Sequence, residues 1–270
     1  MGIDRAGIQA LDYARKNNVS LNNVATIGRQ GIHIKPNFIN KILKQNTIKP
    51  ITPTKENGVW YAEELFKKLG AKNIDSFDYS DYENATVIHD MNIPIPEQYK
   101  NTYDFVFDGG TLEHVFNFPT AIKNCMEMVV PGGYFMSVTP TNNFSGHGFY
   151  QFSPELFFRI FGAGNTNGFE LIGIFMSAND TWYKVSDPAA IHGRVTFRNY
   201  TETSLIVLAK KTEQKNIFEK TPQQSDYIEI WNNKPKQISF GIGHKIIQKI
   251  RHLWIRHVRI YDPNFFKKIK

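Results

Sequence analysis

The sequence predicts an α/β protein with a doubly wound, mostly parallel sheet and a basic helical C-terminal extension. Strand-like and helix-like segments alternate as far as about residue 160, which is typical of a parallel sheet with helices on both faces. Beyond that point two strand-like segments, "FELIGIFMSAN" and "ETSLIVLAKK", follow each other without a helix between them. They predict a hairpin-like end to the sheet.

Apolar spacing and turn residues place the elements of the first half. Ile8, Leu11 and Ala14, spaced by three, predict an amphipathic helix over residues 4–16. The segments after it are predicted as a strand over 23–28, a short helix over 37–44, the helix "GVWYAEELFKKLGA" and the strands "NIDSFDYS", "ATVIHDMN" and "YDFVFDGG".

The second half continues the alternation. "FPTAIKNCMEMVV" predicts a helix that ends at Pro131-Gly132-Gly133, and "YFMSVTP" predicts the next strand. Ser153-Pro154 opens the helix "SPELFFRIF" as an N-cap followed by proline at the first helical position. The predicted domains are a sheet domain over 1–212, a polar linker over 213–235 and a basic amphipathic helical tail over 236–270.

Charge and cysteine content exclude several classes of protein. The chain of 270 residues has a net charge of +7, but nine Lys or Arg and one acid in residues 236–270 give the tail +8 and leave −1 for the rest. A near-neutral body argues against nucleic-acid binding. The single cysteine, Cys125, excludes an internal disulfide and a cysteine-rich zinc site, which favours a reducing, cytoplasmic location. No apolar run approaches the ~20 residues of a membrane-spanning helix, and we expect no signal peptide.

The ends of the predicted strands carry candidate ligand contacts, because ligands of open parallel sheets bind beyond the carboxyl ends of the strands. Four successive strands end in a glycine or a carboxylate, at Gly28, Asp78, Asp90 and Asp108. The carboxylate after the second strand suits ribose hydroxyls, and the one after the third could accept from an adenine amino group. The alternative is that Asp and Gly end strands in many folds, so the prediction rests on their joint recurrence.

Residues 103–140 resemble the second half of a class I S-adenosylmethionine-dependent methyltransferase. The matching pieces are "DFVFD", "LEHV", the helix after it, "PGGYF" and the following strand. The resemblance extends over about residues 20–210. It implies a Rossmann-like sheet of seven strands whose last strand is antiparallel, and methyl transfer from S-adenosylmethionine.

The resemblance also implies a cofactor site with an altered first motif. The family's motif reads like V-L-D-I-G-C-G-x-G, whereas here Thr26 replaces the acid, and Gln30 and Ile32 replace the second and third glycines. In the family's arrangement Gly28 lies under the methionine part of the cofactor. The cofactor contacts that the resemblance implies are Gly28, Gln30, Asp78, Tyr79, Asp90, Met91, Asp108, Gly109 and Thr111.

Glu113, His114 and His147 are candidate catalytic residues, because they follow strand ends at the same edge and could converge there. An imidazole with a near-neutral pKa could take a proton from a hydroxyl acceptor. Some methyltransferases hold a divalent metal with a Glu-x-x-Glu-His motif and a later histidine, but Gly110 stands at the first glutamate here, so we expect no metal. The alternative is that His114 packs at a helix start and His147 caps a loop.

Candidate acceptor contacts come from two loops. Tyr150 and Gln151 follow the fifth predicted strand and offer a hydroxyl and an amide. Trp182 and Tyr183 belong to a predicted irregular loop over 180–200, where aromatic rings beside carboxylates suit a sugar. The alternative is that these aromatics pack over the sheet edge.

The tail combines an apolar stripe with a basic face over residues 242–268. Packing on its own domain or on a second subunit is favoured, and binding to an anionic membrane surface is the alternative. The leading hypothesis is a cytoplasmic enzyme that methylates an oxygen of a small-molecule or glycan-type acceptor. An enzyme of glycan biosynthesis that is peripheral at the inner membrane face is a conjecture, which the aromatic loop and the basic tail motivate. The altered first motif motivates a second hypothesis: a methyltransferase-like binding or assembly protein that has lost cofactor binding.

Overall fold

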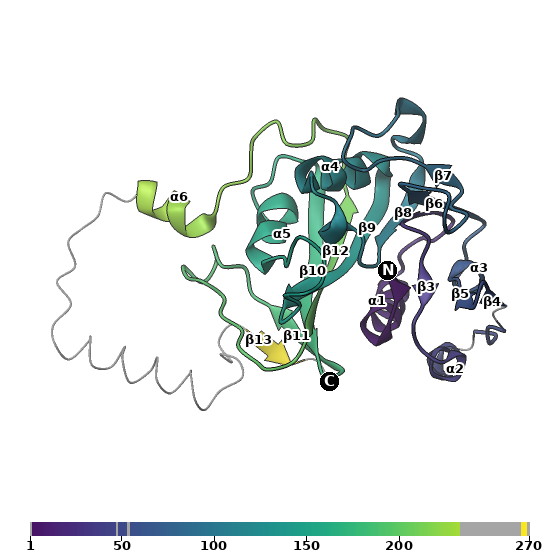
Figure 1. The fold of residues 1–270 in the computed structure, drawn as a ribbon. Helices are drawn as coiled ribbons and strands as arrows, with labels where there is room; N and C mark the ends of the chain where they lie inside the picture. Colours follow the sequence, from purple (N-terminus) through teal and green to yellow (C-terminus); the bar gives the residue numbers. More distant parts are fainter. Residues whose placement is uncertain (1, 47, 53–54, 233–265, 269–270) are drawn as a thin grey trace.

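The computed structural model describes residues 2–46, 48–52, 55–232 and 266–268 (Figure 1). The strands of its main sheet are β2 (Asn23–Ile27), β6 (Asn73–Asp78), β7 (Val87–Ile88), β8 (Tyr103–Asp108), β9 (Val129–Asn142), β10 (Phe169–Ala178), β11 (Thr181–Val185), β12 (Thr203–Lys211) and β13 (Phe266–Lys268). Their order across the sheet is β13-β11-β10-β12-β9-β8-β2-β6-β7.

The centre of the sheet is parallel and one side is antiparallel. β2 pairs in parallel with β6 and β8, β6 with β7, and β8 with β9. β12 runs antiparallel between β9 and β10. The seven strands from β7 to β10 thus form the mostly parallel sheet with an antiparallel last strand that was expected. β11 and β13 extend its edge in antiparallel fashion.

Helices cover both faces of the sheet (Figure 1). α1 (Arg5–Lys16), α2 (Pro36–Gln45) and α3 (Glu63–Lys68) contribute to one buried apolar cluster. α4 (Phe118–Met128) and α5 (Pro154–Phe161) contribute to the other. The predicted three-layer α/β architecture is therefore confirmed.

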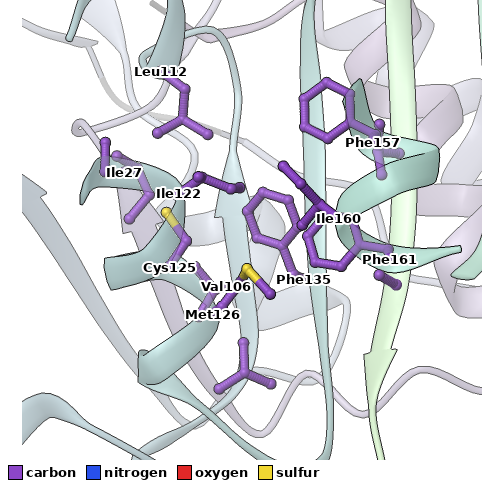
Figure 2. Close-up of a cluster of buried hydrophobic side chains, with 14 of the residues drawn as sticks. Ile27, Val106, Leu112, Ile122, Cys125, Met126, Phe135, Phe157, Ile160 and Phe161 are labelled. Carbon is purple, nitrogen blue, oxygen red and sulfur yellow. The ribbon is translucent and has the colours of Figure 1, made fainter. Parts of the chain in front are cut away.

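The central strand β8 shows why the sheet is buried on both faces. Phe105, Val106 and Phe107 are each fully buried, and such a continuous apolar run is typical of a strand covered on both sides. Figure 2 shows the cluster on the α4 and α5 face, where Cys125 of α4 and Phe161 of α5 approach Val106 and the neighbouring strand. The thiol of Cys125 is thus part of the core.

Two small sheets were not predicted. β1 (Gly2–Ile3) pairs in parallel with β3 (Gly31–Ile32), and β4 (Lys55–Glu56) pairs antiparallel with β5 (Val59–Trp60). The helix predicted for "GVWYAEELFKKLGA" is therefore wrong over its first residues, since α3 begins only at Glu63. Gly58, with φ +84°, forms the turn of this hairpin and directs Val59 and Trp60 into a strand.

The C-terminal part differs from the prediction in two segments. α6 (Ser225–Asn232) lies within the predicted linker. Most of the predicted helical tail, residues 236–270, lies outside the described residues, and residues 266–268 form strand β13 on β11 instead of a helix. Within the described ranges, no helix has the length and apolar character needed to cross a membrane. The remaining short helices are η1 (Glu97–Tyr99) and η2 (Leu112–His114).

Candidate functional site

The carboxyl ends of β8 and β9 border a cavity of about 280 Å³. Gly109 and Gly110 line it after β8, and Thr139 lines it from β9. The N-terminal strand closes one side, because the Gly2 amide donates to the Gly109 carbonyl oxygen at 3.0 Å. The cavity therefore lies at the sheet edge where a ligand was expected.

Glu113 of η2 reaches this cavity with a buried side chain, of which 1% is exposed. Its carboxylate accepts a hydrogen bond from the Thr139 hydroxyl at 3.0 Å. Gly148, with φ +69°, packs on it so closely that a methyl group there would lie 2.9 Å from the Glu113 carbonyl oxygen. The Phe149 amide donates to the same oxygen at 2.8 Å. These contacts fix the loop after β9 onto η2 and bring His147 to Glu113.

The two histidines lie beside Glu113. His147 Nε2 is 3.5 Å from Glu113 Oε1, and half of the His147 side chain is exposed. The rings of His114 and His147 meet edge to face, with centroids 4.9 Å apart. Burial raises the pKa of Glu113, whereas desolvation and the neighbouring His147 lower the pKa of His114. The structure thus brings the three predicted catalytic residues together, although their roles stay predictions.

Asp108 uses its carboxylate inside the protein. It accepts hydrogen bonds from the amides of Thr111 and Leu112 at 2.8 and 3.2 Å, and from the Ser137 hydroxyl at 2.6 Å. Burial, followed by the nearby charge of Glu113, raises the pKa of Asp108 to about 7 despite these bonds. Asp108 therefore holds η2 in place, and its assignment as a cofactor contact stays a prediction.

Gln30 fills the turn assigned to the methionine part of the cofactor. Its side chain is 2% exposed, and Nε2 donates to the carbonyl oxygens of Ile27 and Gly28 at 2.6 and 3.2 Å. Its Oε1 has no hydrogen-bond donor among the described residues and occupies the space that a side chain at Gly109 would need. The Thr111 hydroxyl also donates to Ile27. Gly28, Gln30, Gly109 and Thr111 are thus engaged with one another, and their assignment as cofactor contacts stays a prediction.

Arg29, which the sequence did not single out, anchors the same turn to the segment between β2 and β6. Its guanidinium pairs with Glu56 at 2.9 Å and Glu63 at 2.7 Å, donates to the Glu83 carbonyl at 2.8 Å, and lies 3.8 Å over the ring centre of Tyr61. The "GRQ" turn is therefore held by Arg29 on one side and by Gln30 on the other.

The nucleoside side of the expected site is more open. Asp78, at the end of β6, is half-buried, and its carboxylate accepts only the Ser80 amide, at 3.4 Å, among the described residues. Tyr79 is 73% exposed. Asp90 instead accepts from its neighbour Asn92 at 2.7 and 2.9 Å, and Met91 packs in the core. Asp78 and Tyr79 are the predicted contacts that remain available to a ligand.

Tyr150 and Gln151 shape the loop over the cavity. The Tyr150 hydroxyl donates to the Phe116 carbonyl at 2.7 Å, and Gln151 accepts from the Phe144 amide at 2.8 Å. Both predicted acceptor contacts are thus engaged within the protein.

Trp182 and Tyr183 lie in strand β11, which corrects their placement in an irregular loop. Trp182 packs against Phe175 and donates to Gln9 at 3.1 Å, and Tyr183 packs against Phe197. Neither residue lines the cavity, so the packing alternative describes them better.

Several cavity residues escaped the sequence analysis. Asp4 and His33 line the cavity because β1 pairs with β3, a contact that no local pattern announces. Outside the cavity lining, Phe116 and Phe149 are 73% and 67% exposed, and their rings meet edge to face with centroids 6.0 Å apart. The aromatic residues within "EHVFNF" and "GHGFYQF" could have indicated this exposed aromatic pair in the sequence.

No protein-family model and no curated protein sequence matches the chain. Among solved structures, a proposed methyltransferase from Bacillus halodurans is 10% identical, with 78% of this chain and 100% of that chain covered and a TM-score of 0.45. A proposed sarcosine dimethylglycine methyltransferase from Galdieria sulphuraria is 13% identical, with 78% of this chain and 87% of that chain covered and a TM-score of 0.43. The trans-methyltransferase CalH in complex with SAH is 12% identical, with 76% of this chain and 55% of that chain covered and a TM-score of 0.40. It is the sheet itself, seven strands with an antiparallel last strand, that gives this chain the fold of the class I methyltransferases.

Proposed function

We propose that the chain transfers a methyl group from S-adenosylmethionine to an oxygen of a small-molecule or glycan-type acceptor. One observation carries the proposal: a cavity at the carboxyl edge of β8 and β9 is lined by the buried Glu113 and the half-exposed His147. The open Asp78 stands at the end of β6, on the far side of β2 from β8. Acceptor and nucleoside would therefore occupy neighbouring parts of one edge.

His147 and Glu113 support proton removal from an acceptor hydroxyl. The imidazole is accessible from the cavity, and the Glu113 carboxylate at 3.5 Å can orient it and stabilise its protonated form. His114, whose lowered pKa favours the neutral ring, is the second candidate base. Much of the rate would come from holding the acceptor oxygen in line with the methyl group that the cofactor supplies.

The residues fit the two ends of this cofactor unequally. Asp78 can accept from ribose hydroxyls, because its carboxylate has a single long hydrogen bond among the described residues. At the methionine end, the amide of Gln30 already occupies the carbonyl oxygens of Ile27 and Gly28. Binding of the complete cofactor therefore requires the Gln30 side chain to turn away.

Calorimetric titration of the full chain with S-adenosylmethionine and with S-adenosylhomocysteine tests the proposal. We expect both to bind, and Asp78→Ala to weaken binding at least tenfold, because the ribose hydroxyls lose a charged acceptor whose hydrogen bonds contribute about 1.5–3 kcal/mol. Asp81→Ala, an exposed acid in the following loop, is the matched control and should bind like the unaltered chain. Absence of binding of either compound to folded protein would overturn the proposal.

A second candidate function follows from the closed Gln30 turn. A methyltransferase-like protein that has lost cofactor binding would keep the internal bonds of Gln30, Thr111 and Arg29 and use the cavity for a ligand or partner. This candidate predicts no heat of binding with either compound, also for the Gln30→Gly variant. The same titration therefore separates the two functions.

A further inference from the structure

We propose that Glu113, His114 and His147 form a binding site for a divalent metal ion of the zinc type. Each side chain offers one ligand atom, and the three atoms lie within 4.8 Å of one another. Two imidazole nitrogens and one carboxylate oxygen are a ligand set that zinc uses in sites with an open position.

The distance between Glu113 and His147 fits two ligands of one ion. Two ligands about 2.1 Å from a tetrahedral ion are about 3.4 Å apart. His147 Nε2 lies 3.5 Å from Glu113 Oε1, which is longer than the usual hydrogen bond between such groups. His114 supplies the third ligand atom. Its ring is exposed, and an exposed ring can reorient to bring its nitrogen closer to the other two ligand atoms.

The charge of the cavity favours a cation. Among the described residues that line it, Asp4 and Glu113 are acids and none is Lys or Arg. Asp108, fully buried, adds a further carboxyl group at the end of β8. A buried carboxylate is costly, and a bound divalent ion would reduce that cost.

The supporting contacts hold the first ligand in place. Thr139 donates to Glu113 at 3.0 Å, and Gly148 lets the loop carrying His147 lie directly on η2. Such outer contacts orient metal ligands. The cavity leaves room for a fourth ligand, water or an acceptor hydroxyl, and a hydroxyl bound there would have a lowered pKa. The ion would then activate the hydroxyl in place of the histidine base, because an imidazole nitrogen bound to a metal cannot accept a proton. This use of the ion rests on the proposed function, whereas the binding of the ion does not.

The expectation of no metal rested on Gly110, which stands where a further glutamate would be. In the structure Gly110 packs against Glu113 Oε1 with φ +90°, so this position supplies close approach in place of a ligand. Three ligands remain, two from η2 and one from the loop after β9.

The test is titration of metal-free full-length protein with Zn²⁺ by calorimetry, with Co²⁺ absorption as a second readout, both without S-adenosylmethionine. We expect one ion per chain at this site and a Co²⁺ spectrum of low coordination number. Glu113→Gln and His147→Ala should each lower the affinity more than about tenfold. His192→Ala, which removes a 75% exposed histidine outside the cavity, is the control and should leave it unchanged.

Circular dichroism and thermal unfolding of each variant establish that it is folded. His147→Ala is the decisive variant, because half of this side chain is exposed and its loss leaves the core intact. No zinc binding, or binding that His147→Ala and His114→Ala leave unchanged, would overturn the proposal, since the ion would then use other histidines. Zinc binding without S-adenosylhomocysteine binding would uphold the metal site and refute methyl transfer.

Discussion

Gln30 turns its amide back onto the carbonyl oxygens of Ile27 and Gly28, where β2 ends. The sequence identified the lost glycine at this position but could not tell where the longer side chain would point. That direction depends on Gly109 and on Thr111, which donates to Ile27 from 84 positions along the chain. The internal hydrogen bonds of Asp108 were not predicted for the same reason, because its partner Ser137 lies on another strand.

Gln30→Gly tests the effect of this side chain on cofactor binding. The change frees two carbonyl oxygens and the space beside Gly109, so we expect tighter binding of S-adenosylhomocysteine by about fivefold, the equivalent of one hydrogen bond of ~1 kcal/mol. Calorimetry measures the affinity, and Gln98→Ala, an exposed glutamine in η1, is the control. Weaker binding by Gln30→Gly would mean that the amide itself contacts the ligand.

At the scale of elements, long amphipathic or apolar segments were predicted well. The helix over residues 4–16 and the strand "YDFVFDGG" have counterparts in α1 and β8. Two-residue strands such as β1 and β3 were missed, because their stability comes from pairing with a distant segment rather than from local pattern. The cavity includes residues from both missed strands or their flanks, so its outline could not be predicted.

Lys211 joins the end of β12 to the end of α4 in the core. It is 2% exposed, and its ammonium donates to Asn101 Oδ1 and the Val129 carbonyl at 2.8 Å and to the Met126 carbonyl at 3.2 Å. Burial lowers its pKa from the ordinary 10.5 to about 8, although the charge of Glu127 acts in the opposite direction.

This lowered pKa predicts a pH-dependent stability. Between pH 8 and 10.5 the unfolded chain binds more protons at this lysine than the folded chain does, so this lysine makes the free energy of unfolding rise with pH. The slope is at most ~1.4 kcal/mol per pH unit. Lys211→Met should remove this rise and cost about 1–3 kcal/mol at high pH through its unpaired carbonyls.

Denaturant unfolding across this pH range measures the slope. Lys210→Met, which changes the neighbouring lysine that lies over Tyr134, is the matched control and should retain the rise. Equal slopes in the unaltered chain and in Lys211→Met would show that Lys211 keeps its ordinary pKa.

At the scale of the whole molecule, the alternation of elements was sufficient to predict the sheet, because parallel strands need crossover helices. The path of the segment between β2 and β6 could not be predicted in this way, because it depends on the contacts of Arg29 with Glu56, Glu63 and Tyr61. Charge is distributed unevenly over the chain. Residues 236–270 carry a charge of +8 and the remaining residues carry −1, which together give the net charge of +7.

This asymmetry predicts salt-sensitive binding to anionic surfaces. Basic residues near an anionic membrane contribute about 1 kcal/mol each, so we expect the full chain to sediment with vesicles that contain phosphatidylserine and not with pure phosphatidylcholine. Deleting residues 233–270 should abolish this binding, and raising the salt concentration should weaken it. A full-length variant with Lys245, Lys249 and Arg251 changed to Gln is the control for loss of β13, and it should bind more weakly than the unaltered chain because three of the nine basic residues of the tail are lost. Unchanged sedimentation of this variant, or a deletion that alters only the oligomeric state, would instead assign the tail to subunit packing.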